Sequence, residues 1–211
     1  RAQKKGLVEF ELINLRKFGE GPHQIVDGKL YGGGVGMLLR ADILAKALKS
    51  VTNTSRPRIK CHVLLTSASG NPYKQANARK LSKLDHIIIV CGHYEGVDQR
   101  FIDKYVDEEI SIGDYVLTGG EIPAMAIVDS ITRLIPGVLK KPEAVENESF
   151  SYTEHQTPNS LLVEGPQYTR PDIFEGLKVP EILKSGNHGE IEMWRKEQAL
   201  KKTKKVRPDL L

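Results

Sequence analysis

The sequence has little cysteine, with only Cys61 and Cys91 among 211 residues. Both lie in apolar stretches, so we interpret them as buried thiols of a reducing compartment rather than as a disulfide framework. No group of cysteine and histidine residues has the spacing of a metal site. No apolar run approaches the length of a membrane span, and the residues after Arg1 do not resemble a signal peptide. We therefore expect a cytoplasmic protein that has no metal site and no membrane partner.

Several short motifs of catalysis and nucleotide binding are also missing. The sequence contains no G-x-G-x-x-G dinucleotide fingerprint, no P-loop, and none of the patterns G-x-S-x-G, H-E-x-x-H and C-x-x-C. These absences argue against a nucleotide-dependent oxidoreductase, a serine hydrolase and a zinc protease.

The bulk composition is that of an ordinary globular protein, with 39% hydrophobic and 27% charged residues. The length suits one domain, or one domain with a small addition. The chain begins at Arg1 rather than at a methionine, from which we expect a fragment or a processed end.

The net charge of +4 is unevenly distributed. Residues 195–207 include seven basic side chains and one acid, Glu197, whereas residues 98–114 include six acids. A basic tail beside an acidic body indicates a polyanion as partner. The same pattern is typical of a solvated helix face, and the residues alone leave both interpretations open.

Three apolar segments, residues 61–65, 85–91 and 115–117, are predicted strands, and each is followed by a loop of small residues. Residues 85–91 show little alternation, which fits a strand buried on both faces. Helical segments alternate with the strands, so the fold class is α/β with a mainly parallel sheet. The loops should then gather at one end of the sheet, where ligands bind in such folds.

The third segment organises the domain. Its predicted strand runs into Gly119 and Gly120, and Pro123 is expected to open a helix that continues to Ile135. Strand, glycine turn and helix form the usual outline of a small-molecule site. Many structural turns have the same outline, so a ligand does not follow from this segment alone.

The remaining elements frame this core. Residues 7–15 alternate and predict a half-buried strand, and residues 42–49 and 75–84 predict helices. The four glycines in residues 31–37 predict a loop that approaches either a ligand or another chain segment.

The end of the chain has a different composition. Residues 140–163 are polar and aperiodic, which predicts a flexible linker. A small helical unit, residues 164–211, follows it, with a short helix at 180–183 and a longer one capped by Asn187 and Glu190.

Single residues allow two interpretations each. His93 is either a general base or a polar loop residue. Tyr168, Thr169 and Arg170 either position a phosphate or form a structural turn. Arg133 stands four residues after Asp129, as in a surface ion pair on a helix.

Six motifs in fixed order carry a resemblance across nearly the whole chain. They are YGGGxGM, CGxYEGxDxR, SIGDYVLTGGExPA, IPGVL, PQYTRP and SGNH, at residues 31–37, 91–100, 111–124, 135–139, 166–171 and 185–188. In this set the sequence resembles the bacterial tRNA (guanine-N1)-methyltransferases of the TrmD family, in the SPOUT class.

The resemblance implies a domain at residues 1–139 whose sheet has a deep trefoil knot and lacks its first strand here. It implies an obligate homodimer, with sites at the subunit interface, and a tRNA-binding role for residues 164–211. The implied activity is transfer of a methyl group from S-adenosyl-methionine to N1 of the guanine 3′-adjacent to the anticodon, when another guanine precedes it. Magnesium is an implied aid to activity, with no site identified. The alternative is a non-catalytic SPOUT protein that binds the cofactor or RNA.

The resemblance also assigns residues. It gives Arg133 as the catalytic arginine and Glu148 as the general base, in a position where the family has aspartate. The implied cofactor contacts are Leu65, Thr66, Ser67, Gly92, Glu95, Ile112, Gly113, Asp114, Tyr115, Val116, Leu117, Gly119, Gly120 and Pro123.

Overall fold

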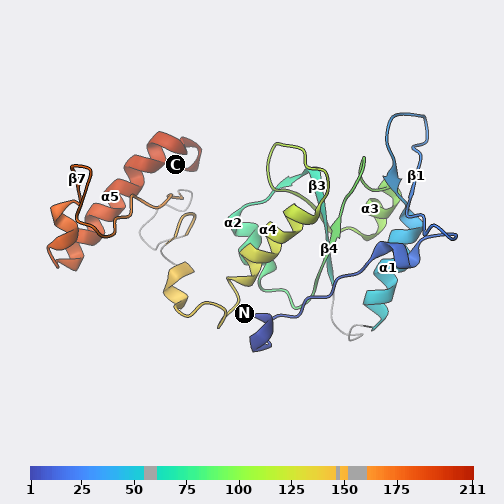
Figure 1. The fold of residues 1–211 in the computed structure, drawn as a ribbon, viewed down its shortest axis with the longest axis horizontal. Helices are drawn as coiled ribbons and strands as arrows, with labels where there is room; N and C mark the ends of the chain where they lie inside the picture. The colour runs from blue at the N-terminus through green and yellow to red at the C-terminus, as the bar shows by residue number, and fades with distance from the viewer. Residues whose placement is uncertain (55–60, 146–147, 152–160) are drawn as a thin grey trace. The chain divides into compact units, whose positions relative to one another are not determined.

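The computed structural model describes residues 1–54, 61–145, 148–151 and 161–211. These residues form two compact units, Arg1–Leu139 and Lys140–Leu211 (Figure 1).

The first unit is built on three parallel strands in the order β4-β3-β5. The central strand is β3 (His62–Pro72), flanked by β4 (Ile87–Cys91) and β5 (Glu108–Ser111). The predicted α/β class with a parallel sheet is thereby confirmed. Burial is greatest in the first half of β3, at residues 63–66, whereas every residue of β4 is only half-buried. The interpretation of β4 as buried on both faces is therefore wrong, because β4 lies at an edge of the described sheet.

The predicted end of the central strand is also corrected. We expected the strand to stop at Leu65, but β3 continues to Pro72, with its pairing to β5 interrupted between Thr66 and Asn71. Gly70 permits this return, because a Cβ at this position would lie 2.6 Å from the Ile110 backbone nitrogen.

One face of the sheet is covered by α1 (Ala41–Thr54) and α3 (Gln99–Tyr105). The predicted helix at residues 42–49 is confirmed, and its apolar spacing presents one face to the strands. The buried cluster on this face consists of Val26, Leu39, Ile43, Leu44, Leu48, Val63, Leu65, Val97 and Phe101.

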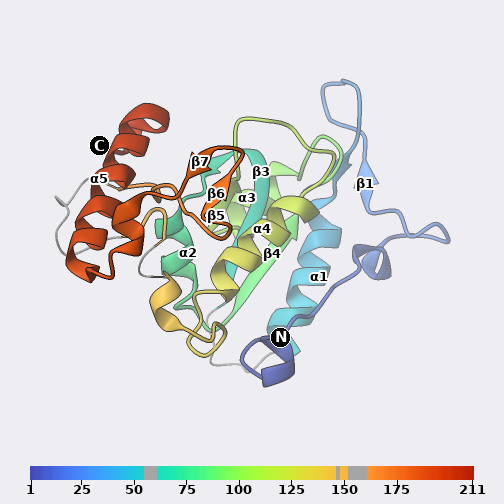
Figure 2. The same ribbon diagram turned by 60° about the vertical axis from the view of Figure 1, so that its left-hand side comes forward.

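The opposite face is covered by α2 (Gln75–Leu81) and α4 (Glu121–Thr132). Figure 2 shows α1 on one side of the strands and α2 on the other. The buried cluster here consists of Leu64, Leu81, Ile110, Ile127 and Ile131. Alternate residues of β3 thus enter opposite cores, as the pleat of a strand requires.

The beginning of the chain differs from its prediction. Residues 7–15 do not form a strand; two short 3-10 helices, η1 (Gln3–Lys5) and η2 (Leu15–Phe18), flank irregular backbone. Leu12 is 96% exposed. The alternation is real, but no strand among the described residues pairs with this segment, and an unpaired strand is not stable.

Two short antiparallel strands, β1 (Asp27–Gly28) and β2 (Leu38–Leu39), enclose the glycine-rich segment. Residues 31–37 form a loop, as predicted, and Gly32, Gly33, Gly34 and Gly36 all have positive φ angles. Side chains reach that region only with strain, which explains why glycine fills these positions.

The second unit contains the short elements η3 (Pro142–Val145), β6 (Ile173–Phe174), β7 (Leu177–Lys178), η4 (Glu181–Lys184) and η5 (Pro208–Leu210). Its long helix is α5 (His188–Val206). The Asn187 side chain accepts a hydrogen bond from Glu190 N at 3.4 Å, so the predicted N-cap is confirmed.

The predicted linker, residues 140–163, is covered only in part. Residues 146–147 and 152–160 lie outside the described residues. Within the described part, Phe150 N donates to Leu162 O at 3.0 Å, and Ser151 Oγ donates to Val145 O at 3.0 Å. No helix in the described part of the chain has the length and apolarity that crossing a membrane requires.

Candidate active site

The carboxyl ends of β4 and β5 lie beside one residue of β3, Thr66. Its Oγ1 lies 3.2 Å from Val90 O in β4 and 3.3 Å from Gly120 O, at the start of α4. Gly120 N in turn donates to Gly92 O at 2.7 Å. The structure therefore places the loops that follow β4 and β5 against each other and against β3, although they are far apart in the sequence.

We call the contact of Thr66 with Val90, Gly92 and Gly120 the junction. Gly120 fits the junction only because it has no side chain. A Cβ at this position would collide with Thr66 Oγ1 and lie 2.7 Å from Gly92 N and 2.9 Å from the Cys91 Cα. The φ angle of Gly120 is −83°, which any residue can adopt, so the requirement is one of space alone.

His93 and Gly119 extend the contact between the two loops. They form an isolated antiparallel bridge, and a Cβ on Gly119 would collide with Glu121 Oε2. The His93 and Tyr94 rings meet edge to face, with centroids 4.5 Å apart. Tyr94 is 49% exposed and has a φ of 57°, a strained conformation of the kind that clusters at functional sites.

The segment between β5 and α4 is a loop. The prediction of a strand at residues 115–117 is wrong: β5 ends at Ser111, whose Oγ accepts from Gly113 N at 3.3 Å and closes a turn. Tyr115 and Val116 are 54% and 85% exposed. Because strands need ladder partners, this apolar run joins the loop surface instead.

Helix α4 also begins and ends earlier than predicted. It starts at Glu121, which places Pro123 inside the first turn, and it ends at Thr132 rather than at Ile135. Pro123 is still tolerated, because the first-turn N–H groups have no helical partner to lose.

The glycine-rich loop belongs to the same end of the unit. Glu95 N donates to Met37 O at 3.0 Å, and a Cβ on Gly36 would collide with the Glu95 side chain. Tyr31 and Val35, at the tip of the loop, are 97% and 92% exposed. The loop therefore approaches another chain segment, which was one of the two predicted possibilities.

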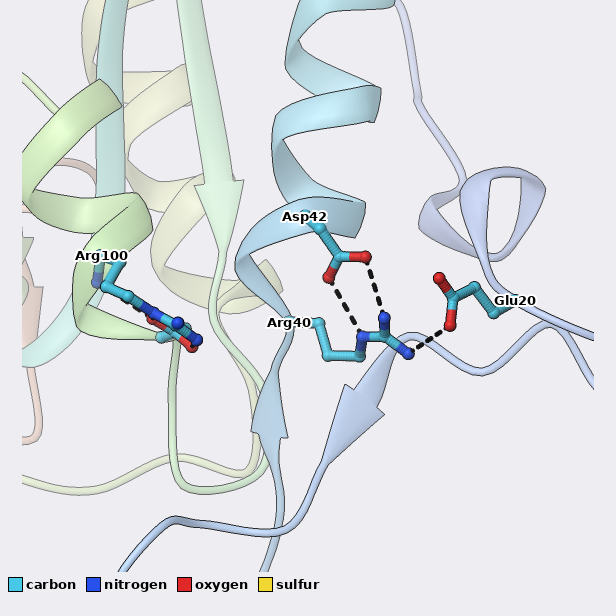
Figure 3. A network of polar contacts seen from close by, with 5 residues as sticks. Glu20, Arg40, Asp42 and Arg100 are labelled. Carbon is cyan, nitrogen blue, oxygen red and sulfur yellow. Dashed lines mark hydrogen bonds and ion pairs between the residues drawn. The ribbon is translucent and has the colours of Figure 1, made fainter.

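Ion pairs fasten the segments beside this loop (Figure 3). Arg40 binds Asp42 through two hydrogen bonds of 3.1 and 2.9 Å and Glu20 through one of 2.8 Å. The hydrogen bond to Asp42 is the largest cause of the raised pKa of Arg40, and the bond to Glu20 is the next. The same bond to Arg40 lowers the pKa of Asp42. The contacts tie the turn before β1 to the start of α1.

A second pair lies at the start of α3. Asp98 caps the helix by accepting from Arg100 N at 3.0 Å, and its two carboxylate oxygens also bind the Arg100 guanidinium. These hydrogen bonds lower the pKa of Asp98. The loop that contains Gly92 and Glu95 is thus anchored at its far end.

Cys91 lies where β4 enters this loop. Burial raises the pKa of its thiol, and the negative charge of Glu121 raises it further. Both cysteines are thiols outside any disulfide and are half-buried, rather than fully buried as predicted. Cys61, at the other end of the sheet, places its Sγ 3.1 Å from His86 Nδ1.

The predicted catalytic residues belong to different compact units. Arg133 is the half-buried C-cap of α4, and its N–H donates to Asp129 O at 3.1 Å. Glu148 lies in the second unit, half-buried, and its carbonyl accepts from Ser151 N at 3.2 Å.

The predicted cofactor residues divide by exposure. Leu65, Thr66 and Gly120 are buried, whereas Glu95, Asp114, Tyr115, Val116 and Leu117 are exposed. The remaining members are half-buried: Ser67, Gly92, Ile112, Gly113, Gly119 and Pro123. Searched over the described residues, the chain shows no cluster of metal-ligating side chains.

Sequence reasoning did not foresee three features of the site. Glu121 acts on the pKa of Cys91, Tyr94 has a left-handed backbone, and Gly36 packs on Glu95. The first and third join residues about 30 and 60 positions apart, as their numbers show. No local pattern records such a contact; only the glycine content of residues 31–37 signalled a close approach.

The fold and the junction define an α/β protein with a candidate ligand site at the carboxyl ends of its parallel strands. The family model described as tRNA (Guanine-1)-methyltransferase TrmD matches residues 1–211. The chain belongs to this family.

Curated relatives agree with the family match. The chain is 50% identical over 211 residues to a tRNA (guanine-N(1)-)-methyltransferase of Dictyoglomus turgidum, covering 100% of this chain and 80% of the relative. It is 48% identical to that of Anoxybacillus flavithermus over 213 residues, covering 100% and 82%. It is 46% identical to that of Moorella thermoacetica over 214 residues, covering 100% and 81%.

Proposed function

We propose that the chain transfers a methyl group from S-adenosyl-methionine to N1 of the guanine 3′-adjacent to the anticodon in tRNA. The observation that carries the proposal is the family match over all 211 residues, which includes every residue of the strand-end junction. A methyltransferase that acts on tRNA requires a small-molecule site beside an RNA site, and the close packing of Thr66, Gly92 and Gly120 supports placing the first of these at the junction.

The residues at the junction fit an adenosyl cofactor. Gly92 and Gly119 are half-buried and have no side chain to keep a ligand from the backbone, while Leu117 and Ile112 offer apolar surface to a purine ring. The loop residues 112–120 and 92–96 would hold it, with Thr66 fixing the loops. The cofactor supplies an electrophilic methyl group, so this transfer needs no metal for activation.

The chain itself must prepare the nucleophile. Neutral guanine carries a proton on N1 and attacks poorly, so a carboxylate must accept that proton; we assign Glu148 to this step. Negative charge then develops on O6 of the guanine, and we assign Arg133 to stabilise it, since a guanidinium offers directed donors. Glutamate is one methylene longer than the aspartate of the family, and its reach to N1 is part of the proposal.

Assembly is part of the same proposal. The protein functions as a homodimer whose sites lie at the subunit interface, and the exposed apolar residues Val116, Ile122 and Met125 support this. The packing of the loops after β4 and β5 fits a trefoil knot. We further propose a cytoplasmic location, a linker around Glu148 that orders on tRNA binding, and a stimulating effect of magnesium.

Methyl transfer to defined tRNA transcripts tests the proposal. We expect transfer when guanine occupies the target and the preceding position, and none when adenine replaces the target. Arg133→Ala should reduce the transfer rate at least 100-fold, about 2.7 kcal/mol of barrier, with cofactor affinity nearly unchanged. Arg133→Lys is the matched control, because lysine retains the positive charge but lacks the planar set of guanidinium donors.

The outcomes separate the two candidate functions. Cofactor binding without transfer, unaffected by Glu148→Gln, would favour the non-catalytic SPOUT protein. Equal losses of rate and cofactor affinity in Arg133→Ala would contradict the role given to the arginine.

A further inference from the structure

The only tryptophan of the chain, Trp194, lies beside an exposed tyrosine in the second unit. The ring centroids of Tyr168 and Trp194 are 6.3 Å apart, and the planes are tilted by 52°. Tyr168 is 46% exposed, whereas Trp194 is half-buried. The pair therefore presents the tyrosine ring to solvent, with the indole beneath it as support.

The backbone around the pair is well anchored. Val163 N donates to Thr203 Oγ1 at 3.0 Å, and Thr203 is fully buried. At Gly165 the chain presses on α5 so closely that a Cβ would lie 3.2 Å from Ala199 N. The segment that leads to Tyr168 is thus held along the helix that contains Trp194.

Cations flank the two rings in the sequence. Arg170 follows Tyr168 by two residues and Arg195 follows Trp194 directly, and both are exposed. Within the described part of the chain, neither has a carboxylate within ion-pair distance.

The negative charges of the acidic residues in α5 are balanced by nearby positive groups. Glu192 binds Lys196 and Glu197 binds Lys201, each at 2.8 Å. Glu190 lies in the first turn, where the helix dipole offsets its charge. The charges left without a partner are therefore mainly positive.

We propose that Tyr168, supported by Trp194, stacks on an unpaired base of the RNA substrate, while Arg170 and Arg195 bind flanking phosphates. The inference rests on the proposed function and adds a contact for the second unit. Exposed aromatic rings beside unpaired cations are the usual composition of a surface for single-stranded RNA. Anticodon-loop bases are of this unpaired kind. An apolar protein partner would not use the two arginines.

Intrinsic tryptophan fluorescence makes the test direct, because Trp194 is the sole emitter of its kind. We expect tRNA, and a short single-stranded RNA of the anticodon-loop sequence, to quench the Trp194 emission of the full chain. Tyr168→Ala should weaken tRNA binding about tenfold, and Tyr168→Phe, the matched control, by less than about twofold. Tyr168→Leu retains an apolar contact to the indole and separates stacking from loss of packing.

Salt dependence distinguishes stacking from charge. Tyr168→Ala should leave the salt slope of tRNA binding unchanged, since it removes no cation, whereas Arg195→Gln should lower the slope by about one. Cofactor affinity should stay at the wild-type value in all these variants.

Two results overturn the inference. One is wild-type tRNA affinity in Tyr168→Ala together with emission that tRNA does not change. The other is a change of oligomeric mass in Tyr168→Leu, which would mean that the Tyr168 ring contacts a second copy of this chain instead of RNA. By contrast, quenching that depends on Tyr168 in a chain that transfers no methyl group would contradict the proposed function and leave the inference standing.

Discussion

Among the glycines of the candidate site, Gly120 has the least space for a side chain. A Cβ there would meet Thr66 Oγ1, Gly92 N and the Cys91 Cα, so two other segments of the chain occupy the place of one absent methyl group. The sequence shows two adjacent glycines but does not show which one is enclosed. Gly119 meets the far ends of Glu121 and His93, which can move, whereas Gly120 meets mostly backbone.

We therefore expect Gly120→Ala to open the junction. Thermal unfolding should show a loss of about 1–3 kcal/mol, as for overpacked sites, and calorimetry should show cofactor affinity reduced about tenfold. Gly189→Ala is the matched control, because its Cβ would meet only Asn187 Oδ1 at 3.7 Å. A Gly120→Ala protein with wild-type cofactor affinity would remove the junction from the site.

Cys91 gives a prediction that depends on pH. Burial and Glu121 raise the pKa of the thiol in the folded state. Its contribution to stability is therefore complete below the pKa of the unfolded thiol and is lost as the pH rises through the folded one. In a Cys61→Ser background, the alkylation rate should rise at higher pH in the folded protein than in the urea-unfolded protein.

Glu121→Gln should move that alkylation profile to lower pH, because it removes the charge and leaves the burial. Glu109→Gln serves as the control, because it removes a negative charge in β5 that does not act on the Cys91 thiol. Coincident profiles for folded and unfolded chains would contradict the raised pKa.

Among the elements, the helices were more predictable than the strands. The helix at 42–49 and the Asn187 cap follow from spacing and side-chain chemistry within one or two turns. The strands at 7–15 and 115–117 failed, because strand formation depends on a partner strand far away in the sequence. The site residues came from motif resemblance, and the contacts among Thr66, Gly92 and Gly120 came only from the structure.

Helix α4 has one buried and one exposed apolar face. Ile127 and Ile131 face the core, whereas Ile122 and Met125 are 61% and 70% exposed. We expect Met125→Glu to weaken the proposed dimer at least about 100-fold in light scattering, since it buries a charge at the interface.

Leu12→Glu is the control for that experiment. Leu12 is 96% exposed and lies outside α4, so its replacement should leave the dimer intact. Equal masses for the two variants at all concentrations would exclude α4 from the interface.

At the scale of the whole molecule, the two units differ in how many of their basic side chains form ion pairs. In the first unit the arginines at positions 40 and 100 are held by acids, whereas α5 has Lys202, Lys204 and Lys205 without such partners among the described residues. The net charge of +4 hides this difference. The basic run predicted from sequence is thus located on one exposed stretch of helix.

Replacing these three lysines by glutamine should therefore lower the salt slope of tRNA binding by about 0.9 for each phosphate that is no longer neutralised. Lys196→Gln with Lys201→Gln is the matched control, because these lysines already bind glutamates at 2.8 Å. Binding measured from low to high salt gives both slopes. Identical slopes in the two variants would place the RNA backbone elsewhere.

The hydroxyl of Thr66 also bears on how the molecule folds. It contacts the backbone of residue 120 directly, 54 positions later in the chain, at the end of the loop that follows β5. Closing such long loops is slow, because chain entropy decreases before the contact forms. We therefore expect the junction to assemble late in folding, once all three strands are in register. A ligand bound there selects the completed topology, and at a hundred times its dissociation constant it adds about 2.7 kcal/mol to the stability of that state.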